Sequence, residues 1–307
     1  MDIIADILDS VWLSGSLFFR ANLNGDWGVL YEPTPSPVFH YIVAGEAWVA
    51  RQRDHDYVHC QAGDVVFFPH GNAHVIAHSP NEQRLPRACI KPEDGCQTTR
   101  ISDADASVRL MCGVFRSRTP LSHPLFATLP DFILMRPERR DGEWLPHAAQ
   151  NLDQAVESAR LGTGALRDRM FELLFVQLLQ SQSNSSCSTY ARFSAAVQDP
   201  AMRRILTEIH QAPGRAWRVD ELATLAHCSR SVFTAKFRRQ IGTSPMAYIN
   251  HWRLHKAHAL LVETAYPIYT VSDLIGYANT SSFIKAFRRK FGATPMGVRE
   301  RAQSVSD

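Results

Sequence analysis

The sequence has no uninterrupted run of eighteen apolar residues, the minimum for a membrane-spanning helix. Its first residues, Met1 to Asp6, have neither the basic start nor the long apolar stretch of a signal peptide. We therefore expect a cytoplasmic protein that does not contact a membrane. With 45% hydrophobic residues, the chain also lacks the low hydrophobicity of disordered proteins, and its 307 residues indicate roughly two domains.

The chain also lacks any CxxC pair, and its cysteines are widely spread, which argues against a disulfide framework. We expect most of them to be thiols. Cys112, in Arg109-Leu-Met-Cys-Gly-Val-Phe, is predicted to be a buried strand thiol. Cys89 and Cys96 instead lie among basic residues in a polar segment, a setting that can lower a thiol pKa and favour oxidation.

The net charge of +3 is unevenly distributed along the chain. Residues 196–307 carry 16 Lys and Arg against 8 Asp and Glu, a net +8, whereas residues 1–195 carry 17 against 22, a net −5. The C-terminal part is therefore the candidate binder of a polyanion, with a merely solvated basic face as the alternative.

Residues 10–120 consist of short β-prone runs broken by turn residues such as Gly45 and Gly63. The runs lie at 38–43, 46–50 and 64–68. This pattern is typical of a sandwich or barrel. Residues 79–107 are rich in Pro, Asp, Arg and Ser, and we expect them to form a long, mobile insertion between two strands.

From about residue 145 the pattern becomes helical. Apolar residues at spacings of three and four predict a helix over residues 165–180 with a broad apolar stripe. The stripe residues are Leu166, Met170, Phe171, Leu173, Leu174 and Leu178. The stripe needs a cover, either the β-domain or a second subunit. A polar run over 181–189 is predicted to be a linker, followed by helices.

A repeat of 50 residues is the strongest signal in the chain. Residues 231–246 read SVFTAKFRRQIGTSPM and residues 281–296 read SSFIKAFRRKFGATPM, with eight of sixteen positions identical. In each copy, two Phe residues four apart share one helical face while polar residues occupy the other. Gly242 and Gly292 are predicted C-caps, and a short upstream helix completes a helix-turn-helix in each copy.

Here the sequence closely resembles the DNA-binding domain of the AraC/XylS family of transcription regulators. The matching residues are Trp252, Arg253, Leu254, Ala257, Leu260, Leu261, Gly276, Tyr277, Ser281, Phe283, Ala286, Phe287, Phe291, Gly292, Pro295 and Arg299. The resemblance implies two helix-turn-helix units on either side of a long helix, here residues 247–261. Such units engage DNA segments about one helical turn apart, roughly 10 bp.

If the four phenylalanines face inward, the opposite faces of the two helices meet the DNA. The candidate DNA-binding residues are Ser231, Thr234, Ala235, Arg238, Arg239, Ser281, Ser282, Lys285, Arg288 and Arg289. We expect Thr234, Ser282 and Lys285 near base edges. The arginines, together with Lys290, lie nearer the helix ends and are expected to hold phosphates. By contrast, His251, His255 and His258 share one face of the connecting helix and are expected to form a surface stripe.

The N-terminal half resembles the cupin superfamily. The spacing Gly63-x5-Pro69-x-Gly71-x2-His74 matches the second cupin motif, and residues 39–48 resemble the strand leading out of the first. The resemblance implies a small β-barrel. Catalytic cupins bind a metal through three histidines and a glutamate. Here His74 is present, but the paired histidines and the Glu expected ahead of Gly45 are missing.

The resulting prediction is a multidomain protein, with a cupin-like β-barrel followed by an all-α domain. The predicted parts are a sensor domain at 1–144, a helical dimerisation and connector segment at 145–183, a linker at 184–195 and the DNA-binding domain at 196–307. Its function is predicted to be sequence-specific binding of double-stranded DNA under the control of a small-molecule, metal or redox signal. The expected partners are promoter DNA, an effector, a second copy of the chain and, as the family implies, RNA polymerase.

The candidate effector or redox residues are His40, His74, Cys89 and Cys96, and His74 is also the candidate ligand of a divalent metal in the barrel. This divalent metal is the candidate cofactor. A local concentration of histidines and a cysteine could bind zinc or copper, although exposed or structural histidines are favoured. The group comprises His55, His59, Cys60, His70, His74 and His78. The alternatives are a metal-dependent cupin enzyme fused to a DNA-binding domain and a purely architectural DNA binder; we predict a sensor and no enzyme.

Overall fold

The computed structural model describes residues 3–9, 13–51, 56–80, 87–90, 106–117, 124–136, 163–182 and 189–304. Its contacts divide the chain into two compact units. The sheet unit comprises Leu13–Arg116 and Pro130–Gln182, and the helical unit comprises Met1–Trp12, Ser117–Leu129 and Ser183–Asp307. None of the helices in the described ranges is both long and apolar enough to cross a membrane.

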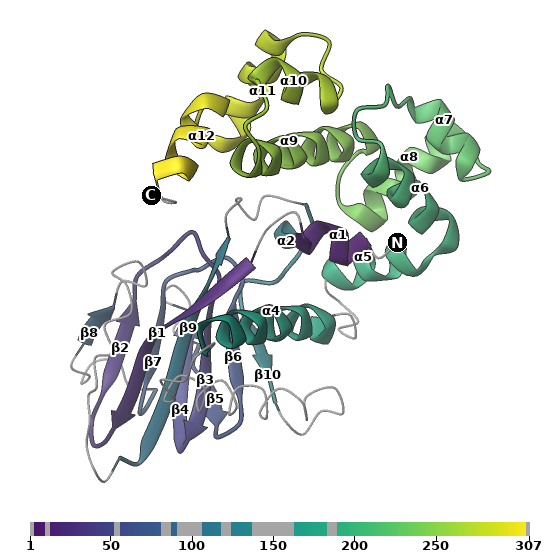
Figure 1. Ribbon diagram of the computed structural model, residues 1–307. Helices are drawn as coiled ribbons and strands as arrows, with labels where there is room; N and C mark the ends of the chain where they lie inside the picture. Colours follow the sequence, from purple (N-terminus) through teal and green to yellow (C-terminus); the bar gives the residue numbers. More distant parts are fainter. Residues whose placement is uncertain are drawn as a thin grey trace. The chain divides into compact units, whose positions relative to one another are not determined.

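The sheet unit is built from two five-stranded sheets (Figure 1). One has the order β1-β9-β3-β6-β10 and the other the order β5-β4-β7-β2-β8. The strands are β1 Leu13–Leu23, β2 Gly28–Tyr31, β3 Val38–Ala44, β4 Glu46–Arg51, β5 Val58–Gln61, β6 Val65–Phe68, β7 His74–Ala77, β8 Arg87–Ile90, β9 Val108–Ser117 and β10 Ile133–Met135. The β-rich, cupin-like domain predicted from the sequence is confirmed.

The core of this unit is formed by inward side chains from both sheets. Val38, Phe68 and Cys112 from the first sheet pack in one cluster with Tyr31 and Val49 from the second. Strands β3 and β6 are buried on both faces. Their second face is covered by a helix, which explains why apolar residues occupy both faces of these strands rather than alternating with exposed polar ones.

That covering helix is α4, Thr163–Ser181, which confirms the helix predicted over 165–180. Its Phe171 ring lies 5.6 Å from that of Phe39 in β3, and its Phe175 ring lies 5.9 Å from that of Phe67 in β6. Gly113 in β9 permits this packing, because a Cβ there would lie 2.3 Å from the Phe39 ring. The sheet therefore covers most of the apolar stripe, but Leu173 remains 51% exposed.

Within the segment 79–107, predicted to be a mobile insertion throughout, the structure contains a strand. Residues 87–90 form β8, which pairs in parallel with β2 so that Cys89 lies opposite Leu30. The prediction was wrong for these residues, because backbone pairing to an open sheet edge does not require an apolar sequence. Cys96 and the rest of 91–105 lie outside the described residues.

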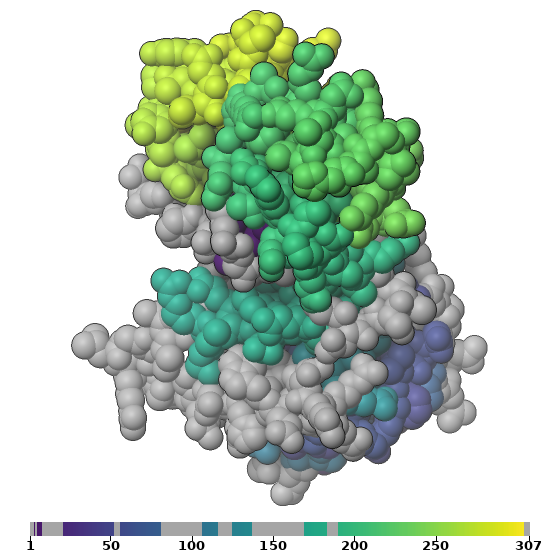
Figure 2. Space-filling view, turned by 90° about the vertical axis from the view of Figure 1, so that its right-hand side faces the viewer, coloured from purple at the N-terminus to yellow at the C-terminus, as the bar shows by residue number. Residues whose placement is uncertain are grey.

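The helical unit contains the repeat, and its C-terminal helices are coloured from green to yellow in the space-filling view (Figure 2). Its helices are α1 Ile3–Asp9, α2 Pro124–Ala127, α5 Thr189–Gln198, α6 Pro200–Gln211, α7 Val219–Leu225, α8 Arg230–Ile241, α9 Pro245–Glu263, α10 Ile268–Leu274, α11 Thr280–Phe291 and α12 Pro295–Ser304. Helix α5 begins inside the segment 184–195 that was predicted to be a linker.

The first helix of the chain packs in this unit, against α6. Its Ile3 and Ile7 are buried, and the Asp6 carboxylate accepts a hydrogen bond from His210 Nδ1 at 2.7 Å. Burial raises the pKa of Asp6, but the His210 hydrogen bond and the charge of Lys256 outweigh this effect and lower it. Two residues that are 204 positions apart in the sequence thus share one hydrogen bond in this unit.

The histidines of α9 do not form the predicted surface stripe. His255 and His258 are buried, and the His258 ring stacks on Phe287 with ring centroids 5.9 Å apart. The prediction failed because the second helix-turn-helix unit packs over this face of α9, and this long-range contact leaves no local signal. Burial lowers the pKa of His255 to about 3, assisted by the nearby His258, and lowers that of His258 to about 4.

These pKa values predict that the helical unit loses stability as the pH falls from 7 to 5. A histidine in the unfolded chain titrates near 6.5, roughly 2.5 to 3.5 units higher than in the folded unit, so between the two pKa values the unfolded state binds more protons. The stabilisation is complete above pH ~6.5 and is lost toward the folded pKa, by up to about 1.4 kcal/mol per histidine and pH unit.

The substitution His258→Phe isolates this effect, because it retains a ring against Phe287 and removes the titration. Urea unfolding of the full-length protein at pH 7 and pH 5 measures it. We expect the variant to lose about 1 to 2 kcal/mol less than the wild type over this interval. Equal losses in the two proteins would contradict a buried, neutral His258.

Candidate DNA-binding surface and buried histidine pair

The first helix-turn-helix unit consists of α7 and α8, and α8 is fixed at both ends by local sequence. Ser229 is its N-cap and accepts a hydrogen bond from the Val232 amide, and Gly242 ends it in the left-handed conformation with φ of 86°. Phe233 and Phe237 are buried, as predicted. Burial of this face commits the opposite face to solvent.

The second unit, α10 and α11, repeats this construction. Asn279 caps α11 by accepting from the Ser282 amide, and Gly292 ends it with φ of 70°. Phe283 and Phe287 are again buried. Basic residues Arg288, Arg289 and Lys290 occupy the last turn, where they also complement the helix dipole.

The predicted DNA-binding residues lie on these outward faces. All ten are exposed except Thr234, which is half-buried. The Thr234 hydroxyl donates to the Arg230 carbonyl within α8 and lines a concave surface together with Arg230, Ser231 and Arg238. Lys285 is exposed, and none of the described residues forms an ion pair or hydrogen bond with its side chain. Lys290 differs from the other basic residues, because burial lowers its pKa to about 8.

The exposed faces of α8 and α11 also carry two apolar residues that the sequence analysis did not include. Val232 is 56% exposed and Ile284 is 37% exposed, each adjacent in sequence to a buried phenylalanine. The sequence analysis selected only polar residues and alanine for the exposed face and therefore did not include them. Helical geometry could have identified them, because a residue next to a core phenylalanine points about 100° away from it.

Lys236 faces away from the reading surface despite its charge. Its Nζ lies 2.7 Å from the carboxylate of Asp199, the N-cap of α6. The Lys236 hydrogen bond is the main reason that the pKa of Asp199 is lowered. The lysine therefore ties α8 to α6.

The two helix-turn-helix units are joined through Arg253 of the connecting helix α9. Its guanidinium donates to the Pro213 and Arg215 carbonyls at 2.7 Å, ahead of α7, and to the Gly276 carbonyl at 3.3 Å, in the turn of the second unit. Gly214 and Gly276 meet so closely that a Cβ on Gly276 would lie 2.2 Å from the Gly214 carbonyl oxygen. One side chain thus links the loop that leads into the first unit to the turn of the second unit.

In the sheet unit, His40 and His74 form a buried pair. They come from different sheets, and their Nε2 atoms are 2.6 Å apart. His74 Nδ1 lies 2.6 Å from the Asn72 carbonyl, which can only accept, so this nitrogen carries the proton. In the neutral pair, His40 Nε2 therefore donates to His74 Nε2, and His40 Nδ1 is left as a buried acceptor with no hydrogen-bond partner among the described residues.

Aromatic and thiol groups enclose this pair. The Phe68 and Tyr31 rings both stack on His74, with centroids 3.8 Å and 4.8 Å from it, and the Tyr31 ring lies tilted against His40 at 4.6 Å. The Tyr31 hydroxyl lies 3.3 Å from Cys112 Sγ. Burial lowers the pKa of His74 to about 4 and that of His40 well below its ordinary value, so both rings are neutral at physiological pH.

The residues present do not fit the metal set of catalytic cupins. The two histidine Nε2 atoms face each other at hydrogen-bonding distance, and the ring of Phe68 covers one face of His74. Among the residues that the structure describes, no group of three or more His, Cys, Asp or Glu could hold a metal ion. Of the other clustered histidines, His59 pairs with Glu46 and His78 with Asp26.

The described cysteines differ in accessibility. Cys112 is buried in β9, as predicted, and burial raises its pKa to about 12, as it does for Cys60. Cys228 is half-buried in the turn between α7 and α8. The backbone of Cys89 lies in β8, and Cys96 lies outside the described ranges.

Comparison with known proteins agrees with both halves of this description. The sequence model of the Cupin family matches residues 2–183, more than half of the chain, and that of a helix-turn-helix domain matches residues 222–301. Among solved structures, ToxT from Vibrio cholerae O395 is 13% identical, with 96% of this chain and 97% of that chain covered and a TM-score of 0.39.

Two curated relatives align over almost their whole length. The RCS-specific HTH-type transcriptional activator RclR of Escherichia coli K12 is 27% identical, with 100% of both chains covered. The HTH-type transcriptional regulator MtrA of Neisseria gonorrhoeae is 25% identical, with 96% of this chain and 97% of the relative covered. The chain therefore belongs to the Cupin family over its N-terminal part and, with the helix-turn-helix domain that follows, is an AraC-family transcription regulator.

Proposed function

We propose that this regulator reads promoter DNA with α8 and α11 while its cupin domain senses the signal. The observation that carries the proposal is the pair of capped helices, each with a buried phenylalanine face and an exposed polar face, held together by Arg253. Two such helices in one rigid unit fit two major-groove segments on one face of a duplex.

Side-chain chemistry divides the contacts within this surface. Ser282, Thr234 and Lys285 are assigned to base edges, and the arginines at the helix ends are assigned to phosphates. Val232 and Ile284 add exposed methyl groups to the same faces, which suit the C5-methyl groups of thymine. The helix-turn-helix domain implies a double-stranded DNA partner, and we propose the individual base and phosphate contacts in addition.

The cupin domain is proposed to sense and not to catalyse. His40 and His74 are engaged with each other, which favours a small molecule acting near this pair over metal chemistry at it. Oxidation at Cys89 and Cys96 is the second route. The alternative, a metal-dependent enzyme fused to a DNA-binding domain, would require ligands beyond the single cupin-motif residue His74.

The protein is further proposed to be a cytoplasmic homodimer that acts with RNA polymerase. Leu173 on α4 supports the dimer, because a half-exposed leucine next to a packed helical stripe is a natural site for a second subunit. We propose RNA polymerase as a partner because the family resemblance implies it.

Replacing Arg253 should weaken binding to DNA that offers both segments more than binding to DNA that offers one. In Arg253→Ala, the Pro213, Arg215 and Gly276 carbonyls lose their shared donor, and the spacing of α8 and α11 is no longer fixed. We expect at least a tenfold loss on the two-segment site, about 1.4 kcal/mol. Fluorescence anisotropy with duplexes selected from a random library measures it. Equal losses on both duplexes would indicate general unfolding instead.

Lys285→Ala should relax sequence preference, whereas Arg239→Ala should weaken all sequences alike. A lost base contact costs roughly 1 to 3 kcal/mol for the preferred base only, while a lost phosphate contact lowers the salt dependence of binding. Selection from random DNA with the wild type and each variant compares the two, and Thr234→Ala tests the first unit. Unchanged preferences in both Lys285→Ala and Thr234→Ala would show that the reading face is misassigned.

The two signal routes make opposite predictions for oxidation. We favour a small molecule that acts near His40 and His74. Mild hydrogen peroxide should therefore leave the DNA affinity of the full-length protein unchanged. A change that dithiothreitol reverses, and that a Cys89→Ser, Cys96→Ser variant loses, would establish the thiol route instead. Cys228→Ser is the control, because this thiol lies in the first helix-turn-helix turn and its oxidation would act on DNA binding directly.

A further inference from the structure

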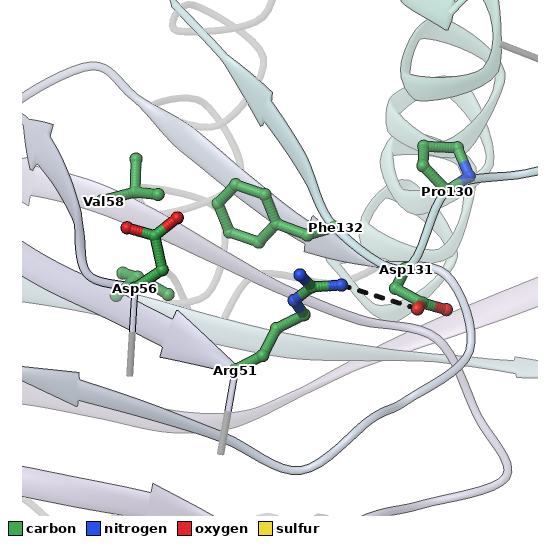
Figure 3. Close-up of a pocket in the computed structure, with 7 residues that line it drawn as sticks. Arg51, Asp56, Val58, Pro130, Asp131 and Phe132 are labelled. Carbon is green, nitrogen blue, oxygen red and sulfur yellow. Dashed lines mark ion pairs between the residues drawn. The ribbon is translucent and has the colours of Figure 1, made fainter. Parts of the chain in front are cut away.

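The sheet unit contains a pocket of about 240 Å³ away from the buried histidine pair. It is lined by residues of β4, residues at the start of β5 and the segment that leads into β10 (Figure 3). None of its lining residues is His40, His74, Tyr31 or Cys112. Its volume lies below the roughly 300 Å³ at which drug-sized sites begin, so its occupant must be small.

The apolar side of the pocket is formed by Val49, Val58, Pro130 and Phe132. The Phe132 ring packs edge to face against the Phe68 ring, with centroids 5.5 Å apart and an interplanar angle of 67°. Phe68 in turn stacks on His74. The wall of the pocket is thus in direct aromatic contact with the cluster that holds the two sheets together.

The polar side carries more negative than positive charge. The Arg51 guanidinium lies 3.6 Å from the Asp131 carboxylate, and this ion pair consumes one of the two acidic groups. The second is Asp56, whose carboxylate has no ion pair or hydrogen bond within the described ranges. Figure 3 shows the Phe132 ring between the Asp56 carboxylate and the Arg51 guanidinium.

These groups select one charge type. An anion would meet two carboxylates and a guanidinium that is already paired. A cation can meet the unpaired Asp56 carboxylate and the face of the Phe132 ring, since aromatic rings attract ammonium groups through their negative face. The hydrocarbon part of the same ligand would then lie against Val58 and Pro130.

We propose that this pocket binds a small organic cation, a primary amine with a short hydrocarbon body, as an effector of the regulator. This inference rests on the proposed sensing function of the cupin domain. The amine pairs with Asp56, its body packs on Phe132, and displacement of that ring is passed through Phe68 to His74.

Isothermal titration calorimetry on the full-length protein tests the charge selectivity with three matched probes. These are 2-phenylethylamine, the neutral 2-phenylethanol and the anionic 3-phenylpropanoate. We expect the amine to bind at least tenfold more tightly than the alcohol, and the carboxylate to bind more weakly than either. Preferred binding of the carboxylate, or no binding of the amine at millimolar concentration, would overturn the proposal.

Three variants locate the binding. Asp56→Asn should reduce amine affinity about tenfold while leaving the weaker alcohol affinity unchanged, because it removes charge at constant size. Phe132→Leu should weaken both probes. Asp26→Asn, which alters an exposed carboxylate of the same unit outside the pocket, should bind the amine like the wild type. Equal amine affinity in Asp56→Asn and the wild type would refute the assigned contact even if Phe132→Leu fails to fold.

Measuring DNA affinity in the same samples distinguishes amine binding in the pocket from the sensing role of the cupin domain. Amine binding without any change in DNA affinity would leave the pocket assignment standing and remove its sensing role. DNA affinity that responds to oxidant, with no amine binding, would retain the sensing cupin domain and refute the pocket.

Discussion

The geometry of the DNA-binding part depends on one arginine and the carbonyl groups around it. Arg253 lies in the long helix between the two reading units and donates to backbone oxygens on both sides of it. A guanidinium presents its donors in a fixed plane, so it defines angles as well as distances. The adjoining contact of Gly214 with Gly276 admits no side chain, which makes the joint short and stiff. Two helices can match the period of a DNA duplex only if such a joint keeps them in register.

Each of the two units has a core that contains buried polar groups. The sheet unit encloses a neutral histidine pair that shares a proton between its sheets, with Tyr31 and Cys112 as polar neighbours. The helical unit encloses His210, whose ring nitrogens are bonded to the Asp6 carboxylate and to the Tyr248 hydroxyl. Both cores therefore hold groups that specify one packing arrangement, because each needs a particular partner to satisfy it.

The sequence predicted best where the signal was local or repeated. The phenylalanine pairs, the capping glycines and the reading faces follow from helical periodicity, which acts over four residues and occurs twice here. Strands β3, β4 and β6 followed from turn residues and β-propensity. The failures were long-range. The burial of His258 depends on Phe287, β8 depends on the edge of β2, and the pairing of His40 with His74 depends on the approach of two sheets. The pocket beside Phe132 is likewise lined by segments about eighty residues apart, and no periodic sequence pattern predicts that they come together.

The position of α1 has a consequence for how the chain is made. Asp6 and His210 are 204 residues apart, yet they belong to the same compact unit, so the sheet unit is an insertion within the sequence of the helical one. The first helix leaves the ribosome long before its binding surface on α6 exists. During that interval the sheet unit can fold by itself, whereas Ile3 and Ile7 remain without their buried site. Packing of α1 into the helical unit is therefore delayed until α6 has been synthesised, 204 residues after Asp6 in the case of His210.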